Sequence, residues 1–168
     1  RLLPLPEAVK TIAVIYDSIE TAAETVSEII RQGIIPRSIE YMDNASIRCA
    51  EEYMKGGLPT DAEAILIIEV DGSENEVSHA LSRVTAVCEK SGARQIKTAE
   101  NRQEAQILWK ARKAVSPALF KYGPDKINED IVVPRSKIPD MVKKIKILSR
   151  ETGLTMVSFG HAGDGNIH

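Results

Sequence analysis

The stretch AEAILIIEVDGS, residues 62–73, decides the fold of this chain. A short run of aliphatic and β-branched residues ends in the turn dipeptide Asp71-Gly72, a pattern typical of a buried strand. In residues 74–92, apolar side chains instead recur every three or four positions along one face of a helix: Val77, Leu81, Val84 and Cys88. The change of period predicts a strand followed by an amphipathic helix at the centre of the chain.

The same alternation continues toward both ends. Strands are predicted at residues 11–18, 36–43, 62–73, 93–100, 126–134 and 154–160. Helices are predicted at residues 19–33, 45–57, 74–92, 101–123 and 135–153. Because several strands are short and half polar, as in IEYMD and IKTAE, a parallel sheet buried on both faces is not favoured. We therefore expect an α+β fold with ferredoxin-like β-α-β units, a mainly antiparallel sheet and helices packed on one face.

Polar residues and prolines mark where the helices begin and change. Ser18 is expected to cap the first helix, and either Asp43 or Asn44 to cap the second. Pro117 lacks an N–H group and is expected to bend or restart the helix over residues 101–123. Pro139 is expected near the first turn of the last helix.

Composition narrows the class of protein. Of the 168 residues, 43% are hydrophobic but only 4% are aromatic, which predicts an aliphatic core. The net charge of -2 provides no basic field for nucleic acid or an anionic membrane, and no apolar run is long enough for a membrane span. Cys49 and Cys88 form no CxxC pair, so we interpret them as buried thiols of a cytoplasmic protein, with a disulfide as the alternative.

The last ten residues, FGHAGDGNIH (159–168), concentrate the candidate chemistry. Their glycines match neither a dinucleotide-binding turn nor a P-loop. A strand–turn–strand hairpin would bring His161 and His168 together, and neutral imidazoles bind divalent transition metals, usually with a third protein ligand. Asp164 would be that ligand or would orient an imidazole. The alternative is a tight hairpin with capping polar residues and no metal.

Two residues of the helix at 101–123 form a second candidate. Arg112 and Ser116 are four positions apart and share a face, so a guanidinium fork and a hydroxyl would together suit a substrate carboxylate. The alternative is a solvated basic face, because Lys110 and Lys113 are neighbours. The polar cluster at residues 128–130 also has two interpretations, part of a site or a surface turn, because the two would have the same sequence pattern.

Three stretches together carry a family resemblance. EDIVVPRSKIP (129–139), the LWKAR segment (108–112) and FGHAGDGNIH resemble the C-terminal domain of FAD-linked oxidases of the vanillyl-alcohol oxidase type. Within that family they are most similar to the glycolate oxidase large subunit and to D-lactate and D-2-hydroxyglutarate dehydrogenases. The resemblance implies an α+β cap over the isoalloxazine ring of FAD, which is held mainly by an N-terminal domain. It implies oxidation of a 2-hydroxy acid to the 2-oxo acid, with hydride transfer to flavin N5.

The resemblance also implies roles for single residues. It makes His161 and His168 catalytic ligands of a divalent metal such as zinc, iron or manganese. It gives the substrate carboxylate to Arg112 and a nearby hydroxyl to Ser116. It places three residues beside the flavin: Gly163, Gly165 and Asn166.

Two departures from the family pattern shape the expectation. The family's third metal ligand is a glutamate downstream of the second histidine, and it is missing from residues 1–168. A lysine that helps to bind 2-hydroxyglutarate in the family is expected near Asn128 and is absent, which favours a smaller substrate such as glycolate or lactate. We thus expect residues 1–168 to be a truncated cap domain, inactive alone, with the N-terminal FAD-binding domain and the chain after 168 absent. The implied partners are a small 2-hydroxy acid, the protein's own FAD domain and an iron–sulfur electron-acceptor subunit. The alternative is a non-catalytic ferredoxin-like module that binds a ligand or regulates a partner.

Overall fold

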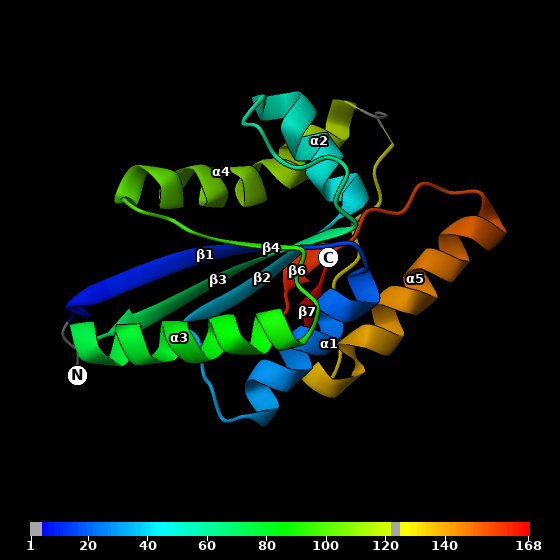
Figure 1. The fold of residues 1–168 in the computed structure, drawn as a ribbon. Helices are drawn as coiled ribbons and strands as arrows, with labels where there is room; N and C mark the ends of the chain where they lie inside the picture. Colours follow the sequence, from blue (N-terminus) through cyan, green and yellow to red (C-terminus); the bar gives the residue numbers. More distant parts are fainter. Residues whose placement is uncertain (1–4, 122–124) are drawn as a thin grey trace.

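The computed structural model describes residues 5–121 and 125–168, which form one sheet with helices on both sides (Figure 1). The strands are β1 (Ala8–Tyr16), β2 (Ser38–Asp43), β3 (Ala64–Gly72), β4 (Gln95–Thr98), β5 (Ile131–Val132), β6 (Phe159–His161) and β7 (Asn166–Ile167). The α-helices are α1 (Ile19–Arg31), α2 (Asn44–Met54), α3 (Glu74–Lys90), α4 (Arg102–Ala118) and α5 (Ile138–Thr152). Short 3-10 helices at Leu119–Lys121 and Arg135–Lys137 follow α4 and precede α5.

The sheet confirms the α+β, mainly antiparallel prediction. Its seven strands run in the order β4-β1-β3-β2-β6-β7-β5, and neighbouring strands pair antiparallel throughout. The units β1-α1-β2 and β3-α3-β4 give the order β4-β1-β3-β2, which is that of a ferredoxin-like core. The helix α2 is inserted between the two units, and β6, β7 and β5 extend the sheet beyond β2.

The prediction that the helices pack on one face is wrong. The helices α1, α3 and α5 cover one face of the sheet, whereas α2 and α4 cover the other (Figure 1). The physical reason lies in β3, where Leu66 and Ile68 are buried in the first layer while Ile65 and Ile67 are buried in the second. Since successive side chains of a strand point to opposite faces, an uninterrupted apolar run needs cover on both.

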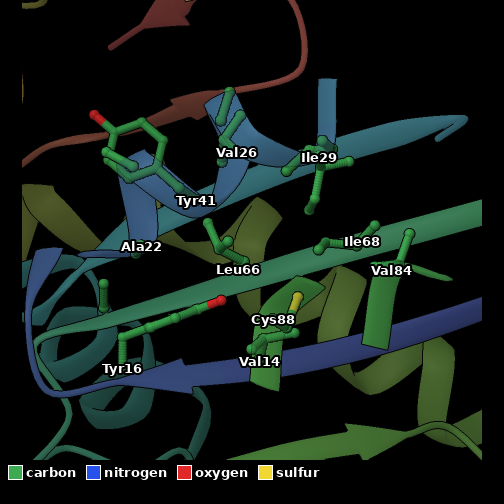
Figure 2. Packing of buried hydrophobic residues seen from close by; sticks show 14 of the residues in the cluster. Val14, Tyr16, Ala22, Val26, Ile29, Tyr41, Leu66, Ile68, Val84 and Cys88 are labelled. Atoms are coloured by element: carbon green, nitrogen blue, oxygen red, sulfur yellow. The ribbon is translucent and has the colours of Figure 1, made fainter. Parts of the chain in front are cut away.

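The larger core is aliphatic, as predicted from the low aromatic content. Figure 2 shows Val26 and Ile29 of α1 and Val84 of α3 packed over Leu66 and Ile68 of β3. All five side chains are fully buried. Each contributes roughly 1.5–3 kcal/mol by leaving water, so this layer is a main source of the free energy of folding.

The first two helices begin where their caps predict. The Ser18 side chain accepts a hydrogen bond from the Thr21 amide at the start of α1. Asp43 accepts from the Ser46 amide and so is the cap of α2, whereas Asn44 is the first helical residue. Both caps satisfy an amide that has no partner within its own helix.

The prolines behave differently in the two C-terminal helices. Pro117 lies in the last turn of α4, and the helix continues to Ala118 before tightening into the 3-10 turn at Leu119–Lys121. The last two residues of the predicted helix, 122 and 123, lie outside the described residues. Pro139 is in the first turn of α5, as predicted. No helix in the described ranges is long and apolar enough to cross a bilayer.

Candidate functional site

The decapeptide at residues 159–168 folds as the predicted strand–turn–strand hairpin. Its strands β6 and β7 pair antiparallel, with His161 opposite Asn166. Gly160 has no room for a side chain, because a Cβ would lie 2.3 Å from the Asn166 carbonyl oxygen. Gly165 adopts φ +90°, and a Cβ there would lie 2.0 Å from the carbonyl oxygen of Val133. The glycines are therefore required by the close approach of the hairpin to its neighbours.

The hairpin brings His161 to a carboxylate from a distant part of the chain. The strand β6 adds to the sheet beside β2, and Glu40 lies directly opposite His161. His161 Nδ1 is 2.6 Å from Glu40 Oε1, and the other carboxylate oxygen accepts a hydrogen bond of 2.9 Å from Arg112 Nε. The Arg112 and Glu40 side chains are only 9% and 7% exposed. Burial lowers the pKa of Arg112, while the Glu40 carboxylate opposes that effect.

Glu40 and Arg112 belong to a closed ring of contacts made by five side chains. The rings of His161 and His168 are edge to face, with centroids 5.2 Å apart. The His168 ring lies 5.4 Å from that of Phe159, and the Arg112 guanidinium carbon lies 4.7 Å from the centre of the Phe159 ring. Glu40 joins Arg112 back to His161. The charged groups of Arg112 in α4 and Glu40 in β2 thus share one small region of the sheet with both histidines.

The second histidine has its own carboxylate. Asp130 Oδ1 lies 2.5 Å from His168 Nδ1, and Asp130 directly precedes β5, which pairs with β7. The Asp130 side chain is 70% exposed, so this pair is far wetter than the one at Glu40. The predicted strand at 126–134 shortens to the two residues of β5, because β7 offers it only two partners.

The spacing of the two imidazoles can be compared with that of a pair of metal ligands. In both rings the contact to a carboxylate uses Nδ1, which leaves Nε2 as the nitrogen for a ligand. Two imidazoles on one tetrahedral ion, with metal–nitrogen bonds of about 2.1 Å, have ring centres about 5 Å apart. The separation of 5.2 Å fits that spacing. Within residues 5–121 and 125–168, however, no third His, Cys, Asp or Glu completes a metal-binding group.

The remaining predicted site residues have partners outside this ring of contacts. Asp164 accepts a hydrogen bond from the Asn166 amide and makes no described contact with either imidazole, so its contact stabilises the turn. Ser116 is exposed, and both its hydroxyl and its carbonyl oxygen accept from Lys126 Nζ at 3.0 Å. The Gly163 amide donates to the Ile39 carbonyl.

Asn166 differs from its neighbours in the hairpin. Its side-chain Oδ1 is buried and has no hydrogen-bond partner among the described residues. A buried acceptor without a donor costs free energy unless another group supplies one. The side chain therefore presents an unused polar atom beside the two histidines.

Glu40 and Asp130 are the two carboxylates of this region that sequence reasoning did not single out. The only signal for Glu40 was an acidic residue within IEYMD, at a strand position that faces the second core layer. Asp130 belongs to the polar cluster at 128–130, which the sequence left open between a site and a surface turn. Neither residue has a spacing to the histidines that a motif would reveal, because β2 and β6 meet only in the folded sheet.

Comparisons with known proteins agree on one family. Residues 5–168 match the family described as FAD linked oxidases, C-terminal domain. The chain is 42% identical over 168 residues to glycolate oxidase subunit GlcD of Bacillus subtilis, covering all of this chain and 36% of that protein. It is 39% identical to the Escherichia coli K12 protein of the same name, covering 34% of it. It is 27% identical over 175 residues to D-lactate dehydrogenase of Anaerostipes hadrus, covering 37% of it.

The chain spans about a third of the length of these curated relatives. Solved structures share its fold at low sequence identity. The 4-ethylphenol oxidase from Gulosibacter chungangensis superposes with a TM-score of 0.69 at 12% identity, over 100% of this chain and 39% of that one. An alkyldihydroxyacetonephosphate synthase gives a TM-score of 0.67 at 13% identity, over 98% and 36% of the two chains. With residues 5–168 matched and two relatives near 40% identity, this chain belongs to the family of FAD linked oxidases, C-terminal domain.

Proposed function

We propose that this chain is the substrate-capping domain of an FAD-dependent 2-hydroxyacid dehydrogenase that converts glycolate or D-lactate to the 2-oxo acid. The observation that carries the proposal is the ring of contacts that connects Arg112 through Glu40 to His161 and through Phe159 to His168. Identity of 42% and 27% to proteins named for glycolate oxidase and D-lactate dehydrogenase supports this substrate class.

The chemistry of a 2-hydroxy acid suits this region. Its carboxylate and its hydroxyl sit on adjacent carbons, so a cation and a hydroxyl-binding group must lie side by side. We assign the carboxylate to Arg112, with Ser116 one helical turn away as a further polar contact. His161 and His168 would hold a divalent metal through Nε2, and such an ion eases loss of the substrate hydroxyl proton as hydride leaves the α-carbon. Zinc, iron and manganese all accept imidazole ligands.

We further propose that the flavin approaches the hairpin from outside this chain. The buried, unpartnered Oδ1 of Asn166 offers an acceptor, and the turn has no side chain at positions 163 and 165. The FAD itself would be held mainly by a separate N-terminal domain, so that residues 1–168 form the cap and the chain after 168 supplies the remaining metal ligand. The share of about a third of each relative supports this arrangement.

An electron acceptor and a cellular compartment complete the proposal. Two relatives are named as a subunit of glycolate oxidase, which supports an acceptor on another subunit, and we propose an iron–sulfur protein for that role. Cys49 and Cys88 are both free and buried, which suits the reducing cytoplasm.

The test uses the full-length protein that contains this chain, purified as expressed. Its visible spectrum is recorded without oxygen before and after addition of glycolate or D-lactate. We expect a flavin spectrum that bleaches with one of the two acids. The variants His161→Ala and Arg112→Ala should bleach far more slowly, whereas His79→Ala, an exposed histidine of α3, should behave as the parent protein. A protein that stays colourless after FAD is supplied would contradict the proposal and favour a ligand-binding module.

A further inference from the structure

A metal-binding histidine presents one ring nitrogen, and the partner of the other nitrogen decides which one it is. In His161 the partner is the Glu40 carboxylate, 2.6 Å from Nδ1. A carboxylate can only accept a hydrogen bond, so the ring proton belongs on Nδ1. The lone pair is then on Nε2, where a metal can use it.

Glu40 is itself held in place from its other side. Its Oε2 accepts from Arg112 Nε at 2.9 Å, so each carboxylate oxygen has a different fixed partner. The Arg112 guanidinium in turn lies over the Phe159 ring, in the strand that carries His161. Rotation of Glu40 would break both contacts at once. The carboxylate therefore ties the orientation of the imidazole to the position of the guanidinium.

Burial makes this tie stronger than the corresponding contact of the second histidine. The Glu40 side chain is 7% exposed, whereas that of Asp130 is 70% exposed. Water competes poorly for a buried carboxylate, and a charge-assisted hydrogen bond gains strength where the local dielectric is low. The contact of Asp130 with His168 Nδ1 has the same form but is open to solvent and salt.

We propose that Glu40 is a positioning residue of this site. It holds His161 with Nδ1 protonated and Nε2 free. It also fixes the position of that metal-binding nitrogen relative to Arg112, the cation proposed to bind the substrate carboxylate. Asp130 does the same for His168 with a smaller effect. The inference rests on the metal site of the proposed function, and its first consequence can be observed without any metal.

That first consequence is the tautomer of His161. The chain, labelled with 15N at histidine, is examined by long-range proton–nitrogen NMR at about pH 8, above the ordinary pKa of imidazole. We expect His161 to show a protonated Nδ1 and a bare Nε2. The exposed His79 in the same spectrum serves as the internal reference. A protonated Nε2 on His161 would overturn the inference, whatever the protein binds.

The second consequence is metal affinity, measured by calorimetric titration of the metal-free full-length protein that contains this chain with zinc chloride. Loss of a carboxylate behind a metal-binding histidine typically weakens binding about 10–100-fold. We expect a loss of that size for Glu40→Gln, a smaller one for Asp130→Asn, and none for His79→Ala. Equal zinc affinity of Glu40→Gln and the parent full-length protein would overturn the positioning role.

Two further outcomes separate this inference from the proposed function. If Glu40→Gln fails to fold, the double variant Glu40→Leu/Arg112→Leu removes the whole buried pair, a change that cores often tolerate. It should fold and show the same loss of zinc affinity, and unchanged affinity would overturn the inference. If the parent chain and the full-length protein both bind no zinc, iron or manganese, the metal part of the proposed function is wrong, and so is this deduction from it.

Discussion

Glu40 and His161 lie directly opposite each other on neighbouring antiparallel strands and are joined by a 2.6 Å hydrogen bond between Oε1 and Nδ1. They are 121 residues apart in the sequence. The register of β2 against β6 alone brings them together, so a shift of one residue would point His161 to the other face of the sheet. The geometry of the site thus depends on the stability of this strand pair.

The buried ion pair of Glu40 and Arg112 should matter for stability as well as for the site. Removing one partner leaves the other charge buried and uncompensated, which typically costs about 3–5 kcal/mol. We expect Glu40→Ala and Arg112→Ala each to lower the free energy of unfolding by this amount in urea titrations. The double variant should lose less than the sum of the two, because it leaves no lone charge.

The control for this prediction is a surface pair of the same kind. Lys137 and Asp140 form an ion pair in which both side chains are 62% exposed. Exposed pairs contribute little, so Asp140→Ala should leave the urea midpoint unchanged. Additive losses in Glu40→Ala/Arg112→Ala would show that the two charges do not interact across the sheet.

The hairpin turn should not tolerate a side chain at Gly165. Its φ of +90° disfavours other residues, and a Cβ would meet the Val133 carbonyl oxygen at 2.0 Å. Gly165→Ala is expected to lower the thermal midpoint and to displace the His161 and His168 resonances. Gly57→Ala is the matched control, because Gly57 has φ +78° but open space around it. Its cost should be limited to the backbone strain, about 1–2 kcal/mol. Equal losses in the two variants would mean that contact with Val133 does not constrain the turn.

Much of this fold follows from local signals in the sequence. The alternation of periods predicts the β-α units and the ferredoxin-like core, and both are confirmed. The cap predicted at Ser18 is also confirmed, and of the two candidates for the second cap, Asp43 and Asn44, the structure has Asp43. The predicted one-face packing is wrong, because half-polar strands such as IEYMD suggest one exposed face of the sheet, whereas β3 has the unbroken apolar run AILII. That run already showed that both faces are covered.

The site was less predictable than the fold. Both histidines lie in one hairpin, so their approach followed from the turn itself, and the structure confirms that hairpin. The carboxylates of Glu40 and Asp130 come from β2 and from the residue before β5, and only the sheet order brings them to the imidazoles. Long-range register of this kind leaves no pattern in a single sequence.

Asp43 should make stability depend on pH in an unusual direction for an acid. Burial raises the pKa of Asp43 to about 6, although hydrogen bonds from the Ser46 and Ser158 amides lower it. Because the folded state then holds the proton more tightly than the unfolded state, the contribution of Asp43 is full below about pH 4. It is lost as the pH rises through 6, by up to about 3 kcal/mol.

The measurement is a set of urea titrations between pH 4 and pH 7 on the parent chain and on Asp43→Asn. Asparagine keeps the oxygen that caps α2 but does not titrate. The difference in stability between the two proteins should therefore shift in favour of Asp43→Asn as the pH rises. A shift in the opposite direction would show that the two amide hydrogen bonds outweigh burial and hold the pKa below its ordinary value.

The two cysteines should be inert in the folded chain, each for the same reason. Cys49 and Cys88 are free and buried, and burial raises the pKa of both thiols, that of Cys88 to about 11. Since the thiolate is the reactive form, iodoacetamide at about pH 8 should add nothing to the native protein and two groups after unfolding in urea. Intact mass spectrometry counts the groups. A mass lower by two hydrogen atoms, with no alkylation in urea unless a reductant is present, would instead establish the disulfide that the sequence left open. Because Cys88 packs beside Val84 and Val14 in the larger core (Figure 2), such a bond would require that core to open.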